Sequence, residues 1–413
     1  MRVKRVERHI IDRQNKWYKL LEEKCHIAKN VYNHGNYIIR QEFIKNGKYL
    51  SYKEVEKALH NDIEYPDYWN LGLANSSQQI LRTLDKNWKS YFKAIKDFSE
   101  HFEKYSGKPK LPKYKKKNGL KEFALTYNQF KLKSDNLIHF PKALNGFTIK
   151  PNFINNQYDT IQQIRFVPQN DRIVVEIIYL KTIVDINIKS NNYIGIDLGI
   201  DNFATIVSNN GIAQIINGKG LKSINRYYNK LIAKNKSKLD LDNVNTKMKY
   251  SYKLNSITNK RNDKVDYFMH NASSYVVNLA LTNNISTIVI GKNESWKNEC
   301  NLGNVNNQKF VQIPYNSFIA KLEYKCQEVG ITLITVDESY TSGTSFLDNE
   351  LPNEDFYNKK RRIKRGLFKS NTGKLINADI NGACQILRKV FVNAFNKPDN
   401  IGFVMNPVKV NII

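Results

Sequence analysis

Two acidic residues in the second half of the chain stand in surroundings where a carboxylate needs a partner. Asp197 is the single charged residue in the apolar run Tyr193 to Leu198, and an isolated carboxylate within a buried strand is costly. A divalent metal is the usual reason for one. Asp379 stands at the start of a helical pattern, where the small residues Gly382 and Ala383 permit close packing. For Asp379 an ordinary helix N-cap is the alternative.

Carboxylates that converge from different elements are suited to phosphodiester hydrolysis. That reaction needs a nucleophilic water and a stabilised leaving oxygen, and two Mg²⁺ ions about 3.5–4 Å apart supply both. Hard cations of this kind bind carboxylate oxygens. Asp197 and Asp379 therefore predict a Mg²⁺ site, with two ions, that needs at least one further acid.

The elements around these acids predict an α/β domain from about residue 191 onward. Asn209-Asn210-Gly211 is a turn signal between two strand patterns. Antiparallel strands with Asp on the first of them begin the RNase H-like nuclease fold, which we expect here. The expected elements are strands at 193–198, 203–208, 212–216, 285–290 and 331–336, and helices at 221–281, 318–328 and 379–390.

The first half of the chain reads as a small β domain interrupted by helices. A strand at 3–11 precedes a helical stretch at 15–105, in which apolar residues recur at helical spacing. Aromatic residues in this stretch, such as Trp88, are more typical of a core than of base stacking. Residues 161–167 and 173–179 predict a β-hairpin.

The charge of the chain favours a polyanionic partner. Lys and Arg number 65 against 38 Asp and Glu, a net charge of +27, which favours nucleic acid before a membrane. An AT-rich genome would explain scattered lysines but not dense clusters. A solvated linker or a disordered loop is the alternative for each cluster. The predicted nucleic-acid contacts are Lys108, Lys110, Lys113, Lys115, Lys116, Lys117, Arg226, Arg261, Lys359, Lys360, Arg361, Arg362, Lys364 and Arg365.

The cysteines and the N-terminus point to an intracellular protein. The four cysteines are far apart and form no Cys-x-x-Cys pair, so we expect neither a disulfide framework nor a cysteine zinc site. The charged N-terminal residues lack the apolar segment of a signal peptide, and no stretch has the length of a membrane span. We expect a cytoplasmic, nucleoid-associated protein without a membrane partner.

Three motifs in the second half of the chain are Ile194-Gly-Ile-Asp197-Leu-Gly-Ile, Tyr340-Thr-Ser-Gly-Thr and Ala378-Asp379-Ile-Asn381-Gly-Ala383. They resemble, in this order, the first RuvC motif, the Tyr-Thr-Ser segment and the third RuvC motif of the TnpB (OrfB) family. This family consists of transposon-encoded, RNA-guided nucleases and is related to type V CRISPR effectors. The resemblance implies a wedge β-barrel with an inserted helical recognition lobe, then a RuvC nuclease domain. It also implies a guide RNA from the transposon end and double-stranded target DNA with a target-adjacent motif.

The sequence departs from this family at the second RuvC strand. The family ends that strand with a catalytic Glu, whereas Gly291 stands there in this chain. A subset of the family has relocated the glutamate, and Glu338, which directly follows the neighbouring strand, fits that subset. The resemblance thus implies Asp197, Glu338 and Asp379 as catalytic residues and Mg²⁺ ligands. Glu294 and an inactive site are the alternatives.

A second departure concerns the zinc ribbon. The four family cysteine positions hold Ser345, Asp348, Lys369 and Thr372, which is not a metal-binding set, so no zinc is expected. The insert instead holds seven cations in the eleven residues 359–369. We expect these cations to bind phosphates near the active site.

These observations predict an RNA-guided DNA endonuclease. A nuclease-dead, RNA-guided repressor of transcription is the alternative, supported by Gly291. A DNA transposase accessory protein is the third hypothesis, although no end-binding domain is visible. The expected domains are residues 1–14 and 106–190 (wedge β-barrel), 15–105 (recognition lobe), 191–345 and 376–413 (RuvC domain and C-terminal tail), and 346–375 (basic insert).

Overall fold

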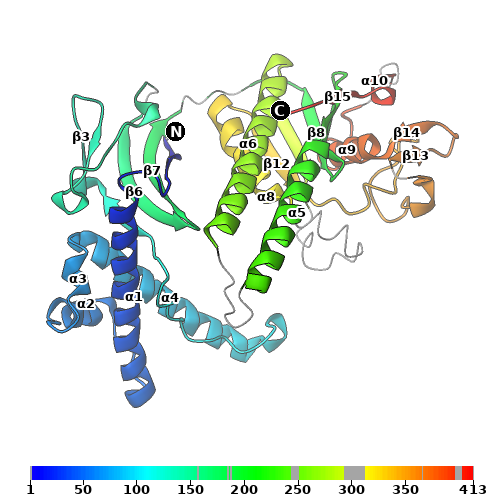
Figure 1. The fold of residues 1–413 in the computed structure, drawn as a ribbon. Helices are drawn as coiled ribbons and strands as arrows, with labels where there is room; N and C mark the ends of the chain where they lie inside the picture. Colours follow the sequence, from blue (N-terminus) through cyan, green and yellow to red (C-terminus); the bar gives the residue numbers. More distant parts are fainter. Residues whose placement is uncertain are drawn as a thin grey trace. The chain divides into compact units, whose positions relative to one another are not determined.

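The fold comes from a computed structural model that describes most of the chain. It describes residues 2–155, 158–183, 186, 188–242, 251–292, 312–364, 366–395 and 402–412. The chain divides into two compact units, Met1–Ile183 and Val184–Ile413, and Figure 1 follows them by colour along the sequence. Each unit is described by itself.

A four-stranded antiparallel sheet forms one layer of the N-terminal unit, in the order β1-β7-β6-β2. The predicted hairpin is confirmed as β6 and β7, and Asn170 takes the left-handed conformation in its turn (φ 53°). The strands of this sheet are β1 (Arg2–Ile11), β2 (Phe123–Thr126), β6 (Thr160–Gln169) and β7 (Arg172–Thr182). A smaller sheet contains β3 (Lys131–Leu132), β4 (Ile138–His139) and β5 (Thr148–Ile149).

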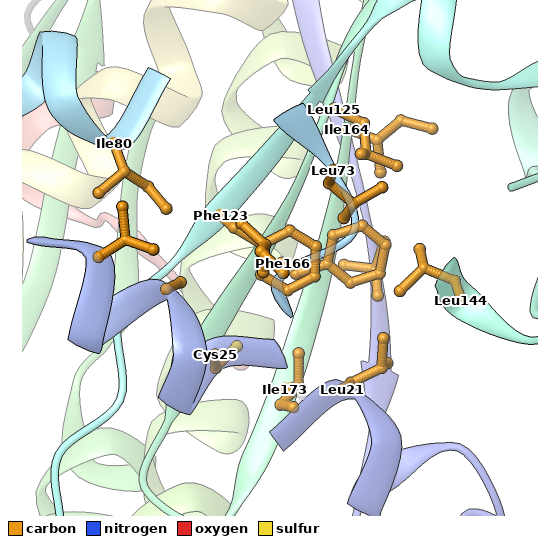
Figure 2. Close-up of a cluster of buried hydrophobic side chains, with 14 of the residues drawn as sticks. Leu21, Cys25, Leu73, Ile80, Phe123, Leu125, Leu144, Ile164, Phe166 and Ile173 are labelled. Atoms are coloured by element: carbon orange, nitrogen blue, oxygen red, sulfur yellow. The ribbon is translucent and has the colours of Figure 1, made fainter. Parts of the chain in front are cut away.

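Four helices pack with this sheet around one apolar core. They are α1 (Tyr18–Asn46), α2 (Tyr52–His60), α3 (Asp67–Asn70) and α4 (Ala74–Glu100). Figure 2 shows Cys25 of α1 near the Phe123 and Phe166 rings, which stack with centroids 4.6 Å apart. Trp88 of α4 is fully buried, so its predicted place in the core is confirmed.

A six-stranded sheet forms the centre of the C-terminal unit, in the order β12-β11-β8-β9-β10-β15. Its first three strands in the chain form the predicted antiparallel meander, and β11 and β12 add to β8 in parallel. The strands are β8 (Tyr193–Leu198), β9 (Asn202–Ser208), β10 (Ala213–Asn217), β11 (Thr287–Gly291), β12 (Thr332–Val336) and β15 (Val408–Val410).

Two expectations for this sheet need correction. The apolar pattern at 331–336 predicts a buried strand, but β12 is partly exposed because it forms the edge of the sheet. The expected last helix is followed by a short helix, α10 (Gly402–Met405), and by β15, which pairs in parallel with β10. Three residues that pair at a sheet edge leave too short a pattern to recognise in the sequence.

Alternation along β8 decides which face of the sheet each residue meets. Ile194 and Ile196 pack with helices on one face, whereas an added Cβ on Gly195 would lie 2.4 Å from the Ala383 carbonyl oxygen of the helix on the other face. The helices are α5 (Lys219–Asp242), α6 (Tyr252–Thr282), α8 (Tyr315–Val329) and α9 (Ala378–Arg388), and α9 is the one beside Gly195.

The helical region expected at 221–281 contains most of α5 and most of α6, while residues 243–250 lie outside the described residues. Among the described residues no helix has both the length and the apolar composition needed to cross a membrane. Cys25, Cys326 and Cys384 are buried free thiols, and Cys300 lies outside the described residues.

Candidate active site

Asp197 is positioned by its parity on β8. It lies on the same face as Gly195, which is the face that α9 covers. Helix α9 passes so close that an added Cβ on Gly382 would lie 2.7 Å from Asp197 Oδ2. Only glycine at this position leaves the carboxylate its space, so the small residues of the third motif serve the contact that the sequence predicted for them.

Asp379 lies in the first turn of α9, but it is not the N-cap. The cap is Asn377, whose Oδ1 accepts hydrogen bonds from the backbone N–H groups of Asp379 (2.9 Å) and Ile380 (3.2 Å). The N-cap alternative for Asp379 is therefore wrong. Its carboxylate instead accepts from Asn202 Nδ2 at 2.7 Å and from Arg362 Nη2 at 3.0 Å.

Glu338 lies where a side chain at position 291 would stand. Gly291 pairs with Val336 across β11 and β12, and Glu338 follows Val336 by two residues, which keeps it on the same face. An added Cβ on Gly291 would lie 2.7 Å from both Cγ and Oε1 of Glu338. The missing side chain on β11 therefore makes room for the glutamate from the next strand. Glu294, the alternative, lies outside the described residues.

The Tyr-Thr-Ser segment fixes the backbone that follows Glu338. Thr341 donates to the Glu338 carbonyl oxygen from its backbone N–H (3.2 Å) and from its hydroxyl (2.8 Å). Tyr340 adopts a left-handed conformation (φ 67°), and its ring meets that of Tyr357 edge to face. This turn follows the end of β12 and fixes the backbone at Glu338, next to the edge strand of the sheet.

All three predicted acids line one cleft of about 670 Å³. The pKa of the Asp197 carboxyl is raised well above its usual range, first by burial and then by the negative charges of Glu338 and Asp379, while Arg362 acts in the opposite direction. The acids are thus close enough to repel one another. Asp201 also lines the cleft but pairs with Lys222. Asp337 accepts from the backbone N–H of Ser339 at 3.0 Å and is not among the lining residues.

The chemistry of these donors fits a hard divalent cation. Three carboxylates supply oxygen ligands of the kind that Mg²⁺ prefers, and a cation would relieve the repulsion that raises the pKa of Asp197. However, the described part of the chain contains no group of three His, Cys, Asp or Glu side chains close enough together to bind a metal ion. Asp379 is engaged by Arg362 and Asn202, and this engagement would have to loosen.

The basic insert does not present all its cations to solvent. Arg361 pairs with the buried Glu350 at 2.5 Å, and Arg362 binds Asp379. The neighbouring Lys359, Lys360 and Lys364 are exposed, and Arg365 lies outside the described residues. One of the residues predicted to bind phosphate, Arg362, therefore belongs to the acidic cleft.

A second lysine-rich segment, the basic arm at 104–121, belongs to the N-terminal unit. Its backbone is bound along one stripe of α1, which excludes a free linker over the bonded part. Asn33 exchanges two hydrogen bonds with the Lys115 backbone (2.8 and 2.9 Å), and Arg40 donates to the Pro112 carbonyl oxygen at 3.0 Å. Lys29 and Asn36 add bonds to Lys117 and Pro112. The side chains of Lys108, Lys110, Lys113, Lys115, Lys116 and Lys117 are exposed.

The two predicted helical arginines differ. Arg226 is exposed on α5. Arg261 on α6 donates to Asn225 Oδ1 (2.8 Å) and to the Gln312 carbonyl oxygen (2.7 Å), and it lies over the Tyr228 ring. Arg261 therefore ties α6 to its neighbours, and its contact with nucleic acid stays a prediction.

Sequence reasoning missed two asparagines of the site. Asn202 orients Asp379, and Asn381 of α9 binds the backbone of Thr344 and Phe346 at 2.8 and 2.9 Å. Asn381 lies within the third motif, so its position was visible but its role was not. Asn202 directly follows Asp201 at the start of a strand, and nothing in its neighbours pointed to a residue 177 positions away.

Comparisons with known proteins show which proteins this chain resembles. A family model described as "Probable transposase" (OrfB of IS605) matches residues 177–297, and a model of the Cas12f1-like TNB domain matches residues 315–386. TnpB-like protein ORF457 of Acidianus two-tailed virus is 23% identical over 437 residues, which cover 94% of this chain and 88% of that protein.

A solved structure shares the fold. The protein of a Cas12f1–sgRNA–target DNA complex, solved by cryo-EM, aligns with a TM-score of 0.52 and 17% identity, over 89% of this chain and 82% of that one. The mixed α/β fold is therefore TnpB- and Cas12f-like. The family models and the viral relative thus make this chain similar to TnpB-like proteins, and the cryo-EM structure shares its fold.

Proposed function

We propose that the protein is an RNA-guided DNA endonuclease that hydrolyses DNA in a RuvC-like site. The observation behind this proposal is that Glu338 fills the space in front of Gly291. It lies on the same face of the sheet as Asp197, and both line one cleft with Asp379. Three acids from β8, from the end of β12 and from α9 thus converge, although the strand that would supply a glutamate lacks one. We assign Asp197, Glu338 and Asp379 as catalytic residues.

The same three acids would hold Mg²⁺, two ions in the two-metal arrangement, and bound metal would supply an activated water and stabilise the leaving oxygen. The chain's own residues prepare the carboxylates for this task. Asn202 fixes one oxygen of Asp379, and Gly382 leaves room for the Asp197 carboxylate beside the cleft. The Thr341 bonds hold the Glu338 backbone. Arg362 balances part of the negative charge while no metal is bound.

Guide RNA and target DNA are the proposed partners. The Cas12f1 relative was solved with sgRNA and target DNA, and the net charge of +27 favours polyanions. We propose a guide RNA from the transposon end and double-stranded DNA with a target-adjacent motif, with sequence read by base pairing. The basic arm, Arg226 and the exposed lysines of the insert would contact phosphates. The relocated-glutamate subset of the family is the proposed group.

Plasmid cleavage in Mg²⁺ tests this function. The protein is co-expressed with the RNA from its transposon end and presented with a library of flanking sequences. Wild type and Glu294→Ala are expected to cut, whereas Asp197→Ala, Glu338→Ala and Asp379→Ala are not. Retained cutting in Glu338→Ala, with loss in Glu294→Ala, would move the third acid to Glu294.

Binding assays on the same library separate the alternatives. Guide-dependent binding without cutting in wild type would favour the nuclease-dead repressor. Cutting followed by joining of the DNA ends would favour the transposase accessory role. Omission of Mg²⁺ and a scrambled guide serve as controls, because each should abolish cutting for a separate reason.

A further inference from the structure

Glu350 is a buried acid outside the catalytic set, and its carboxylate is the centre of a hydrogen-bond cluster. Its side chain is 8% exposed. Oε2 accepts from the Ser345 backbone N–H at 2.7 Å and from Arg361 Nη1 at 2.5 Å. Oε1 accepts from Asn371 Nδ2 at 3.1 Å. One carboxylate thus joins three parts of the segment 344–377 that are far apart along it.

Helix α9 fixes the backbone around the same residue. Gln385 Nε2 and Arg388 Nη1 donate to the Glu350 carbonyl oxygen at 3.0 and 3.3 Å. Asn381, one turn earlier on this face of α9, binds the Thr344 and Phe346 backbone. The helix that carries Asp379 in its first turn therefore also holds Glu350 through its later turns.

The arginine next to the cluster enters the acidic cleft. Arg361 is held by Glu350 and is 15% exposed, whereas Arg362 is 40% exposed and donates to Asp379 Oδ1 at 3.0 Å. An exposed arginine loses considerable rotamer entropy when it is held in one place. Because Arg362 is not held in place by burial, the position of its backbone depends on Arg361, which Glu350 anchors.

We propose that Glu350 is a positioning residue that holds Arg362 in the cleft as a resident counter-cation, which a divalent ion must displace from Asp379. The inference rests on the proposed function only in taking Asp379 as a metal ligand. The proposal explains why Asp379 accepts a hydrogen bond from an arginine in a cleft whose carboxylates suit a metal cation. Arg362 also opposes the charge repulsion felt by Asp197.

Metal affinity of the full-length protein tests the proposal without RNA, DNA or cleavage. The probe is Mn²⁺ or Mg²⁺ alone, and the readout is the rise in melting temperature with metal concentration, which yields an apparent affinity. Arg362→Gln removes the competing cation and should tighten binding by about fivefold or more. Glu350→Gln and Arg361→Gln, which cut the anchor from its two sides, should tighten binding in the same direction.

The double variant Glu350→Gln/Arg362→Gln decides between a positioning and a separate role. If Glu350 acts through Arg362, the double variant binds metal no more tightly than Arg362→Gln alone, because the anchor has nothing left to hold. Additive effects would overturn the proposal. So would weaker binding, or no measurable binding, in Arg362→Gln.

Two matched controls address charge and stability. Lys360→Gln removes an exposed cation two residues from Arg362 and should leave metal affinity within about twofold, since exposed charges are screened. Glu176→Gln loses a buried carboxylate that pairs with Arg8 and Arg165 in the N-terminal unit; it should lower stability without changing metal affinity. The metal-binding test and the cleavage test are independent. If the effects of Glu350→Gln and Arg362→Gln on metal affinity are non-additive but the wild-type protein cuts no DNA, this inference stands and the endonuclease proposal is overturned.

Discussion

The two basic segments of the molecule look alike in sequence and differ in structure. In the basic arm at 104–121 the backbone is bound to α1 and the six predicted contact lysines are exposed. In the insert at 359–369 two arginines turn inward, Arg361 to Glu350 and Arg362 to Asp379, while Lys359, Lys360 and Lys364 stay exposed. The arm presents its predicted contact lysines and buries Lys121, at its end, beside Glu122. The insert turns two of its predicted contact residues into its own unit.

The difference follows from the chemistry of the two cations and from their neighbours. The guanidinium group matches a carboxylate with directed donors, whereas the lysine ammonium is a strongly hydrated point charge on a flexible stem. The insert has acids within reach of its arginines. A run of basic residues in a sequence therefore does not show whether its side chains face solvent or point into the protein. That depends on which acidic residues lie next to it in the folded structure.

The largest expected effect concerns the acidic cleft that Arg362 of the insert enters. Asp197→Asn should reduce DNA cleavage by at least about a thousandfold, while the metal-free protein keeps or gains stability because repulsion with Glu338 and Asp379 is relieved. Cleavage assays and thermal melting measure the two outcomes. Near-normal cleavage by this variant would remove the reason for treating the insert as part of a catalytic centre.

A smaller change tests the place of Glu338. Gly291→Ala should lower cleavage by about a hundredfold, because the new Cβ displaces the glutamate and a misplacement of about 1 Å can cost that much. Gly220→Ala, a glycine with open space around it, is the matched control for the added methyl group. Equal rates for both variants would show that the third acid is elsewhere.

The basic arm should act on affinity rather than on the chemical step. Replacing Lys113, Lys115, Lys116 and Lys117 by Gln should weaken guide RNA binding and lower the salt slope by about 0.7–0.9 for each phosphate that the arm no longer neutralises. The control removes the same charge from the exposed Lys53, Lys57, Lys86 and Lys93 of α2 and α4. A control that weakens binding equally would mean that only net charge matters, and the contrast between the two segments would lose its meaning.

The anchoring of the arm has its own test. Asn33→Ala removes both hydrogen bonds to Lys115. The free energy needed to detach the arm from α1 should therefore fall by about 1–2 kcal/mol. Limited trypsin digestion should then cut at 113–117 faster than in wild type. Asn46→Ala, which removes a hydrogen bond at the far end of α1, should leave the digestion unchanged; faster cutting there too would indicate general loosening of the helix.

The smallest effect is a pH dependence far from both segments in sequence. Burial and the nearby Lys321 lower the pKa of Lys325 to about 8. The unfolded chain holds this proton up to about pH 10, so stability should rise between about pH 8 and pH 10, because the folded form then no longer carries a partly buried charged amine. Lys325→Met should lack this rise in denaturant titrations, and a slope equal to wild type would contradict the assignment.

Much of the C-terminal unit could be predicted because its signals are local. An apolar strand with one acid and a turn at Asn209-Asn210-Gly211 reflect contacts made nearby in the sequence. The small residues beside Asp379 can also be recognised locally, although Gly382 contacts Asp197 on a strand distant in the sequence. The direction of Arg362, the bond from Asn202 and the cluster around Glu350 depend on residues brought together only by folding. No spacing rule in the chain encodes them.

The space shared by Gly291 and Glu338 constrains how such a site can change over generations. A glutamate restored on β11 would collide with Glu338, and loss of Glu338 alone would leave the cleft one acid short. Under the proposed function, either single step passes through an impaired protein, so two simultaneous changes are needed to exchange the two arrangements. The steric conflict at Gly291 would then be enough to keep the acid on the neighbouring strand.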